Sequence, residues 1–321
     1  MAESPMLISV VIPCYKSAAT VGGVVDELSA ALSLRSVDYE IILVNDGSPD
    51  GGATIARLRD IAAADRHVVV VNLARNFGQH RAIMAGFHQV RGDVVVVLDD
   101  DGQTPGDQIY RLVDKIAEGH DIVYARYPQK KHSAYRNLGS RFNAWCNHRF
   151  MGIPKDLWAT SYFACRRFVV DHAIKYENPY PYVDGLLFEA TRSYATVDME
   201  HRSREAGSSG YSLRRLLSLW LDGFTAFSVK PLRVATIVGS LLALCGFIGI
   251  VMLVLGRLFE RITVEGWTSL MVLVLFIGGL TMLMLGLVGE YVGRIYLSLN
   301  NKPQFVVRET FDRRGDAGRA E

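Results

Sequence analysis

The chain has few cysteines, and none is spaced for pairing or for metal binding. Four occur among 321 residues, no two form a C-x-x-C pair, and one lies inside an apolar run; they are Cys14, Cys146, Cys165 and Cys245. This usage excludes a disulfide framework and a zinc site. We expect a reduced protein that faces the cytosol.

A large excess of charge of one sign is also missing. The 35 basic and 33 acidic residues leave a net charge of +2. Nucleic-acid-binding proteins concentrate basic charge, so no nucleic-acid partner is expected. Hydrophobic residues make up 50% of the chain, which excludes a disordered protein. Residues 1–13 lack a charged segment followed by a long apolar one, so no signal peptide is predicted.

Two common nucleotide-binding motifs are absent. No G-x-G-x-x-G follows the first apolar run, which argues against a dinucleotide-dependent oxidoreductase. No G-x-x-x-x-G-K-[ST] occurs anywhere, which argues against a P-loop NTPase.

Two long runs without a charged residue occupy the C-terminal third. They cover 234–256 and 267–289, and each is long enough as a helix to cross a ~30 Å hydrocarbon core. Buried helices of soluble proteins rarely run so far without a charge. The short connection between the runs predicts a transmembrane helical hairpin over 234–289. Basic residues flank its outer ends: Lys230, Arg233, Arg294, Lys302 and Arg308. The excess of basic residues at the outer ends over the connecting loop predicts that the N-terminal part and the tail, 290–321, are cytoplasmic.

Amphipathic segments precede the hairpin. In the juxtamembrane segment 211–233, large apolar residues fall on one helical face: Leu213, Leu216, Leu217, Trp220 and Phe224. Directly ahead of a span, this pattern predicts a helix in the membrane interface. A second candidate, 135–150, fits a core helix as well as an interface helix, and both interpretations stay open.

Residues 1–210 alternate β-branched apolar runs with helix-like segments. The runs cover 7–13, 40–46, 67–73 and 93–99, and helices are expected over 18–33, 53–64 and 79–90. Nearly continuous apolar runs are typical of strands covered on both faces. The order predicts an α/β fold with a doubly wound, mainly parallel sheet, in which ligands bind at the carboxyl ends of the strands.

Carboxylates follow the predicted strands. Asp99, Asp100 and Asp101 come directly after the fourth run, and their mutual repulsion is relieved if they hold a cation. Mg²⁺ and Mn²⁺ sites use one or two such side chains and leave positions for substrate phosphates. The aspartates of 46–50, taken alone, fit a turn and helix cap better than a ligand site.

Five motifs appear in order along the chain. They are V-I-P-x-Y (11–15), V-N-D-G-S-x-D (44–50), R-N-x-G-x-x-x-A-x-x-x-G (75–86), D-x-D-x-Q-x-P (99–105) and R-E-x-G-x-S-x-Y (204–211). With the two C-terminal spans, this set resembles the membrane-bound polyprenyl-phosphate glycosyltransferases of glycosyltransferase family 2. The nearest subtype resembles the bacterial undecaprenyl-phosphate glucosyl and aminoarabinosyl transferases. The resemblance covers nearly the whole chain and implies a cytoplasmic GT-A catalytic domain over 1–210.

The resemblance also implies roles for individual residues. The nucleotide-sugar site is expected to include Pro13, Tyr15, Asp46, Gly47, Ser48, Asn76 and Gly78. Asp100 is expected to support this site indirectly, because in an extended segment it points the opposite way from Asp99 and Asp101. Asp99 and Asp101 match the family's metal-binding pair for Mg²⁺ or Mn²⁺. Gln103 is expected beside the diphosphate or the sugar.

The chain departs from the family pattern at several positions. Lys16-Ser17 stands where Asn-Glu is common, and Asn45 stands for the first aspartate of Asp-Asp-Gly-Ser. These two changes leave the nucleotide base open, with uridine expected from the resemblance. Gly210 replaces a lysine and removes one candidate phosphate contact. The family's candidate catalytic base has no clean counterpart, and Asp156 is the nearest residue.

The expected acceptor is itself an anion. A phosphate monoester has a second pKa of about 6, so it is largely dianionic at neutral pH and needs cations more than a base. Arginine suits this role because its planar fork grips phosphate oxygens in pairs. The candidates are Arg126, Arg136, Arg202 and Arg204, with Ser209 and Tyr211 as hydrogen-bond donors.

The implied reaction is an inverting transfer of a sugar from a UDP-type nucleotide diphosphate sugar to polyprenyl (undecaprenyl) phosphate. It would take place at the cytoplasmic face of the inner membrane, in a multi-pass protein that forms a homo-oligomer such as a tetramer. A processive polysaccharide synthase would carry Q-x-x-R-W and more spans, which the sequence lacks. A non-catalytic membrane scaffold that retains the fold stays open because of the changes at Lys16, Asn45 and Gly210.

Overall fold

The computed structural model describes residues 6–35, 37–127, 160–199, 267–299 and 302–314, with the single positions 154, 157, 239, 241, 248, 251 and 255. The chain divides into two compact units. The first comprises Met1–Leu213 and Asn301–Glu321, and the second is Arg214–Asn300. The strands described all belong to the first unit.

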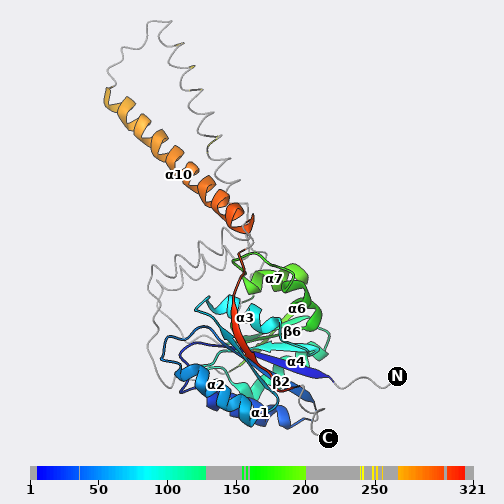
Figure 1. Ribbon diagram of the computed structural model, residues 1–321. Coiled ribbons are helices and arrows are strands. Elements are labelled where there is room, and N and C mark those ends of the chain that lie inside the picture. The colour runs from blue at the N-terminus through cyan, green and yellow to red at the C-terminus, as the bar shows by residue number, and fades with distance from the viewer. Residues whose placement is uncertain are drawn as a thin grey trace. The chain divides into compact units, whose positions relative to one another are not determined.

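A mixed sheet of eight strands forms the centre of the first unit, in the order β7-β5-β6-β4-β1-β2-β3-β8 (Figure 1). The strands are β1 (Leu7–Cys14), β2 (Asp38–Asn45), β3 (Val68–Leu73), β4 (Val94–Val97), β5 (Ile122–Arg126), β6 (Phe163–Arg166), β7 (Tyr194–Asp198) and β8 (Val307–Phe311). The central strands β4, β1, β2 and β3 run parallel. β6 and β8 run antiparallel to their neighbours. The predicted α/β sheet with a parallel centre is therefore confirmed.

Helices cover both faces of the sheet, which explains the continuous apolar runs of the central strands. On one face α1 (Val21–Ser33), α2 (Ala53–Ala64) and α4 (Ile109–Ala117) share a core with the strands. On the other face α3 (Gln79–Phe87) packs so closely that a Cβ on Gly86 would lie 2.4 Å from Val11 Cγ1. The remaining helical elements of this unit are η1 (Gly106–Gln108), α6 (Arg167–Ala173) and α7 (Val183–Ala190).

Two of the three predicted helices differ from the prediction at one end. α2 has the predicted bounds, whereas α1 begins at Val21 rather than at residue 18. The reason is a turn, in which the amides of Thr20 and Val21 both donate to Ser17 O at 3.0 Å. α3 ends at Phe87 rather than at residue 90, because Gln89 N turns back to Gly86 O at 2.8 Å.

The C-terminal tail supplies an edge strand that the sequence did not predict. β8 pairs antiparallel with β3, and Ala74 N donates to Val306 O at 2.8 Å where the pairing ends. Its side chains alternate in exposure and carry charge, as expected for an edge strand. The tail is therefore part of the sheet of the first unit.

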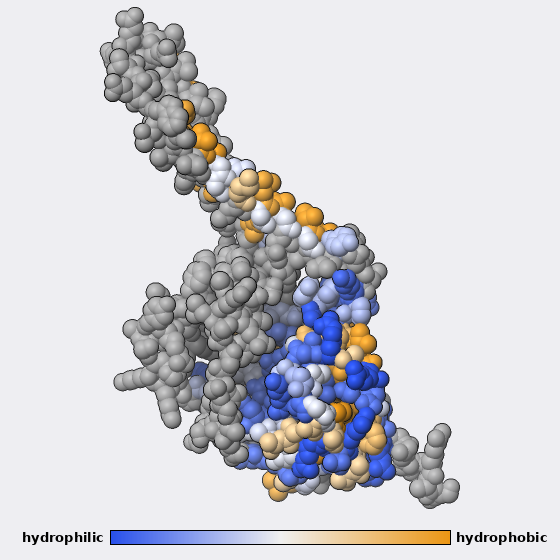
Figure 2. Space-filling model, turned by 60° about the vertical axis from the view of Figure 1, so that its left-hand side comes forward, coloured by the Kyte–Doolittle hydropathy of each residue, from blue (hydrophilic) through white to orange (hydrophobic). Residues whose placement is uncertain are grey.

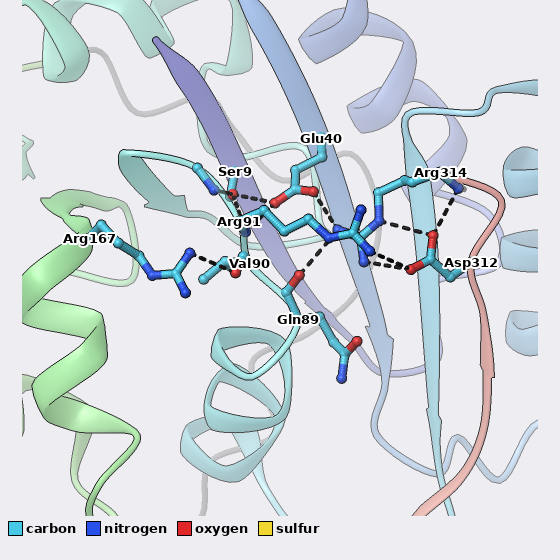
Figure 3. A network of polar contacts seen from close by, with 9 residues as sticks. Ser9, Glu40, Gln89, Val90, Arg91, Arg167, Asp312 and Arg314 are labelled. Atoms are coloured by element: carbon cyan, nitrogen blue, oxygen red, sulfur yellow. Dashed lines mark hydrogen bonds and ion pairs between the residues drawn. The ribbon is translucent and has the colours of Figure 1, made fainter. Parts of the chain in front are cut away.

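Arg314 fastens the end of this tail near the amino-terminal ends of β1 and β2 (Figure 3). Its guanidinium pairs with Glu40 and, at 2.7 Å, with Asp312. The side chains of Arg314 and Glu40 are 9% and 4% exposed. Glu40 also accepts hydrogen bonds from Ser9 Oγ at 2.5 Å and from Arg91 N at 2.6 Å. The buried carboxylate is thus fully engaged.

Replacement of Arg314 should destabilise the first unit strongly. Arg314→Ala leaves the Glu40 carboxylate buried without its cation, which costs about 3 kcal/mol or more. We expect the Tm of the full chain in detergent to fall by several degrees in a thermal-shift measurement. Arg35→Ala is the matched control, because the Arg35–Asp114 pair is about half exposed and should contribute less than about 1 kcal/mol. Equal effects of the two substitutions would contradict the prediction.

The second unit is described mainly by α10 (Trp267–Leu299), which contains the second predicted span. Its exposed side chains are largely apolar, as the orange atoms along it show (Figure 2). Most of the first predicted span, 234–256, lies outside the described residues, and the amphipathic segments 211–233 and 135–150 lie wholly outside them. Within the part of the chain that the structure describes, no helix combines the length and hydropathy needed to cross a membrane.

Candidate active site

The loop after β1 is held by three successive backbone amides. Each donates to a side chain from another segment: Tyr15 N to Asp100 Oδ2 (2.9 Å), Lys16 N to Ser48 Oγ (3.0 Å) and Ser17 N to Thr54 Oγ1 (3.1 Å). These contacts hold Lys16 in the left-handed region, at φ 58°, which costs a non-glycine residue about 1–2 kcal/mol. The sequence P-x-Y-K-S therefore forms a fixed loop at the carboxyl edge of the sheet.

Asp46 ties the loop after β2 to the loop after β3. Its carboxylate accepts hydrogen bonds from Phe77 N at 2.7 Å and Gly78 N at 2.9 Å. Burial raises the pKa of Asp46, although both amides favour the charged form. Gly47 follows at φ 54°, and a Cβ there would lie 2.1 Å from the carbonyl carbon of Arg75. This contact explains why glycine is required in D-G-S.

The acidic triplet Asp99–Asp101 follows β4. Asp99 and Asp101 have different hydrogen-bond partners from Asp100. Asp99 Oδ1 accepts from Gln79 Nε2 at 2.9 Å, and Asp99 Oδ2 accepts from the hydroxyl of Ser161. Asp101 Oδ1 accepts from Gln103 N at 3.1 Å. Asp99 is therefore oriented by α3 and by the segment before β6.

Asp100 turns toward β1, where it binds the Tyr15 amide. Its pKa is raised to about 6, mainly by burial and further by the charges of Asp99 and Asp101. The same two charges, after burial, raise the pKa of Tyr127. Negative charge is thus concentrated where β4 ends, and a cation there would relieve the repulsion.

Asp99 and Asp101 offer the hard oxygen ligands that Mg²⁺ and Mn²⁺ prefer. Among the described residues, no group of three or more His, Cys, Asp or Glu side chains converges on one point. This donor set fits a cation that is held by one or two carboxylates and keeps its remaining positions for substrate and water. It does not suit a structural site closed by protein ligands.

The structure brings most of the residues predicted to bind the nucleotide sugar and its cation to one edge of the sheet. Pro13 and Tyr15 lie at the end of β1, and Asp46–Ser48 follow β2. Asn76 and Gly78 follow β3, and Asp99–Gln103 follow β4. Sequence reasoning missed the residues whose side chains hydrogen-bond to this edge: Gln79 and Ser161 to Asp99, Thr54 to Ser17 N, and Asn72 to Asn45. Only Gln79 lay within a quoted motif.

Of the residues predicted to act on the acceptor phosphate, the structure describes only Arg126. Arg126, at the carboxyl end of β5, forms a two-point ion pair with Asp198 of β7 (Nη2–Oδ2 2.9 Å), and this bond raises the pKa of Arg126. Its guanidinium thus joins two strands, and a phosphate would have to compete with Asp198. The other predicted residues lie outside the described part of the chain: Arg136, Asp156, Arg202, Arg204, Ser209 and Tyr211.

Comparisons with known proteins agree with the motifs. Residues 9–171 match the model of glycosyl transferase family 2, and residues 230–295 match the GtrB C-terminal hairpin. An undecaprenyl-phosphate 4-deoxy-4-formamido-L-arabinose transferase of Yersinia pestis is 36% identical over 308 residues, 94% of this chain and 93% of that protein. Its counterpart in Yersinia enterocolitica is 36% identical over 317 residues, 96% of this chain and 95% of that protein.

Solved structures are more distant. Glucosyl-3-phosphoglycerate synthase of Mycobacterium tuberculosis is 21% identical, with a TM-score of 0.49 over 67% of this chain and 77% of that one. A complex of the same enzyme with Mn²⁺, UDP and phosphoglyceric acid also gives 21% and 0.49, over 67% and 75%. The family match and the curated relatives confirm the resemblance seen in the motifs: the chain is a glycosyltransferase and belongs to glycosyltransferase family 2.

Proposed function

We propose that the protein transfers a sugar, with inversion, from a nucleotide diphosphate sugar of the UDP type to undecaprenyl phosphate. One observation carries this proposal. The acidic triplet and the loops after β1, β2 and β3 lie at one edge of the sheet, in a chain that matches undecaprenyl-phosphate sugar transferases over 94% of its length. The donor would lie against Tyr15, Ser48 and Gly78, because these residues belong to the loops that the hydrogen bonds fix.

Asp99 and Asp101 would hold a divalent cation, Mg²⁺ or Mn²⁺. When bound, such a cation neutralises charge that develops on a departing diphosphate. The chain's own contribution is to keep the ligands in place. Gln79 and Ser161 orient the Asp99 carboxylate, and Asp100 fixes the loop after β1 through the Tyr15 amide.

Gln79 gives this metal site a specific test. Gln79→Met removes the hydrogen bond to Asp99 and should raise the metal concentration for half-maximal activity about tenfold, the scale expected for loss of a group that orients a ligand. Gln108→Met is the matched control. The described hydrogen bond of the Gln108 side chain is an exposed one, in which Oε1 accepts from Arg111 Nη1 at 2.9 Å. Initial rates across a Mn²⁺ titration measure the effect. An unchanged metal requirement in Gln79→Met would remove this role.

The acceptor would approach from the membrane. The match to a GtrB C-terminal hairpin, the two uncharged runs and the apolar exposed side chains of α10 support a membrane hairpin over 234–289. The catalytic domain would then face the cytoplasm, next to the headgroup of undecaprenyl phosphate. Arg204, with Arg136 and Arg202, remains the proposed cation for that phosphate.

A transfer assay tests the proposal directly. The full chain in detergent is incubated with Mn²⁺, undecaprenyl phosphate and radiolabelled nucleotide sugars. Label in a mild-acid-labile lipid is the expected result. Label in long polymer would indicate a processive synthase instead, and no transfer across a broad set of donors would favour a non-catalytic scaffold.

A further inference from the structure

A chain of hydrogen bonds crosses the carboxyl edge of the sheet, from the C-terminal tail to the loop after β1. Three of its four hydrogen bonds join segments that are distant in the sequence, and the fourth joins Asn45, at the end of β2, to Ser48 in the loop that follows. The links are Lys16 N to Ser48 Oγ (3.0 Å), Ser48 Oγ to Asn45 Oδ1 (2.7 Å), Asn45 Nδ2 to Asn72 Oδ1 (2.8 Å) and Asn72 Nδ2 to Glu309 Oε1 (2.7 Å). We call these five residues the relay.

The direction of every bond in the relay is fixed by its ends. At one end the Lys16 amide can only donate, and at the other the Glu309 carboxylate can only accept. Ser48 N also donates to Asn45 Oδ1, at 3.3 Å, which independently orients that amide. Both asparagine side chains must therefore present oxygen toward Lys16 and nitrogen toward Glu309.

The middle of the relay is buried, so mismatched groups there would be costly. Asn45 is 4% exposed and Asn72 is 6% exposed. A buried donor or acceptor that loses its partner costs far more than an exposed one, and fully satisfied networks hold a single arrangement. The hydrogen bond from Asn72 is the largest cause that lowers the pKa of Glu309, so the tail carboxylate stays ionised as the final acceptor.

We propose that Glu309, acting through Asn72 and Asn45, is a positioning residue for the nucleotide-sugar site. The relay fixes the Ser48 hydroxyl and thereby holds Lys16 in its left-handed conformation, beside the exposed ring of Tyr15. The inference rests on the proposed function, in which this loop contacts the donor. It gives the tail strand β8 a part in donor binding.

The two bonds that Asn72 makes in the relay can be broken and then rebuilt with their directions reversed. Asn45→Asp keeps the acceptor for Ser48 but sets a second oxygen against Asn72 Oδ1. If the Asn72 amide turns over, its oxygen meets the Glu309 carboxylate instead. Adding Glu309→Gln removes this conflict, because a glutamine amide can donate to the reversed Asn72 while Asn72 donates to the new aspartate.

The experiment compares the wild type, Asn45→Asp and the double variant Asn45→Asp/Glu309→Gln as full chains in detergent. We expect Asn45→Asp to raise the KM for the nucleotide sugar about tenfold, with the KM for undecaprenyl phosphate changed less than about twofold. In the double variant the KM for the nucleotide sugar should fall most of the way back to the wild-type value. Thr310→Ala, on the neighbouring exposed position of β8, should match the wild type.

Hydrogen exchange of the peptide that carries Lys16 provides a readout that does not depend on activity. Exchange should be faster in Asn45→Asp and should slow again in the double variant. The inference would be overturned if Asn45→Asp had the wild-type KM for the nucleotide sugar and wild-type exchange. It would also be overturned if Glu309→Gln did not reverse the changes in KM and exchange that Asn45→Asp causes. A wild type that transfers no sugar would instead refute the proposed function, while the exchange pattern would still decide whether the relay exists.

Discussion

Asp101→Asn is expected to lower sugar transfer by about a thousandfold or more while leaving the fold intact. The substitution keeps an oxygen for the Gln103 amide, so the local turn survives. It removes one of the two carboxylates proposed to hold the cation, and an amide is a much weaker ligand for Mg²⁺ or Mn²⁺. The loss is expected to be large because the cation stabilises charge that develops in the transition state. Initial rates at increasing Mn²⁺, with circular dichroism of the purified variant, measure both parts.

A matched control separates the metal role from a general loss of negative charge. Asp114→Asn removes a carboxylate that is paired with Arg35 on the surface, and transfer should be unchanged. Removal of the metal from the wild type with a chelator should reproduce the Asp101→Asn defect, and added Mn²⁺ should reverse it only in the wild type. Near-normal transfer by Asp101→Asn at saturating Mn²⁺ would eliminate Asp101 as a ligand.

The centre of the fold could be predicted because its strands are buried on both sides. In β3 and β4 every residue is buried and all but Asn72 are apolar, so the sequence of each strand reads as an apolar run. The same logic placed the acidic triplet, since residues that follow parallel strands meet at one edge. Local patterns were sufficient for both results.

The supporting contacts depend on pairings between distant segments, which local patterns do not encode. Asn72 and Glu309 are 237 residues apart, and they meet only because β8 pairs with β3 in one register. Before the pairing is known, the tail segment 307–311 reads as a charged cytoplasmic tail. Arg126 is a second example: its role as a phosphate ligand stays a prediction, and the ion pair with Asp198 that a phosphate would have to displace follows only from the parallel pairing of β5 with β7.

Gly47→Ala is expected to disrupt the candidate donor site more than an added methyl group at any other loop glycine that the structure describes. The left-handed backbone alone costs alanine about 1–2 kcal/mol. The added Cβ would also lie 2.1 Å from the carbonyl carbon of Arg75 and 2.4 Å from the amide nitrogen of Asn76. That backbone cannot retreat freely, because Asp46 holds the amides of Phe77 and Gly78. Displacement of these loops by about 1 Å would lower transfer about a hundredfold.

Gly51→Ala distinguishes this steric effect from backbone strain alone. Gly51 also has a positive φ, 67°, but a Cβ there meets no atom within 4 Å. This control should lose only about 1 kcal/mol of stability and keep nearly full activity. Thermal unfolding and transfer rates of both variants provide the comparison. Because the two glycines are separated by only four positions and share the left-handed conformation, any larger defect in Gly47→Ala comes from the contact with the loop after β3. Equal behaviour of the two variants would mean that this contact does not shape the donor site.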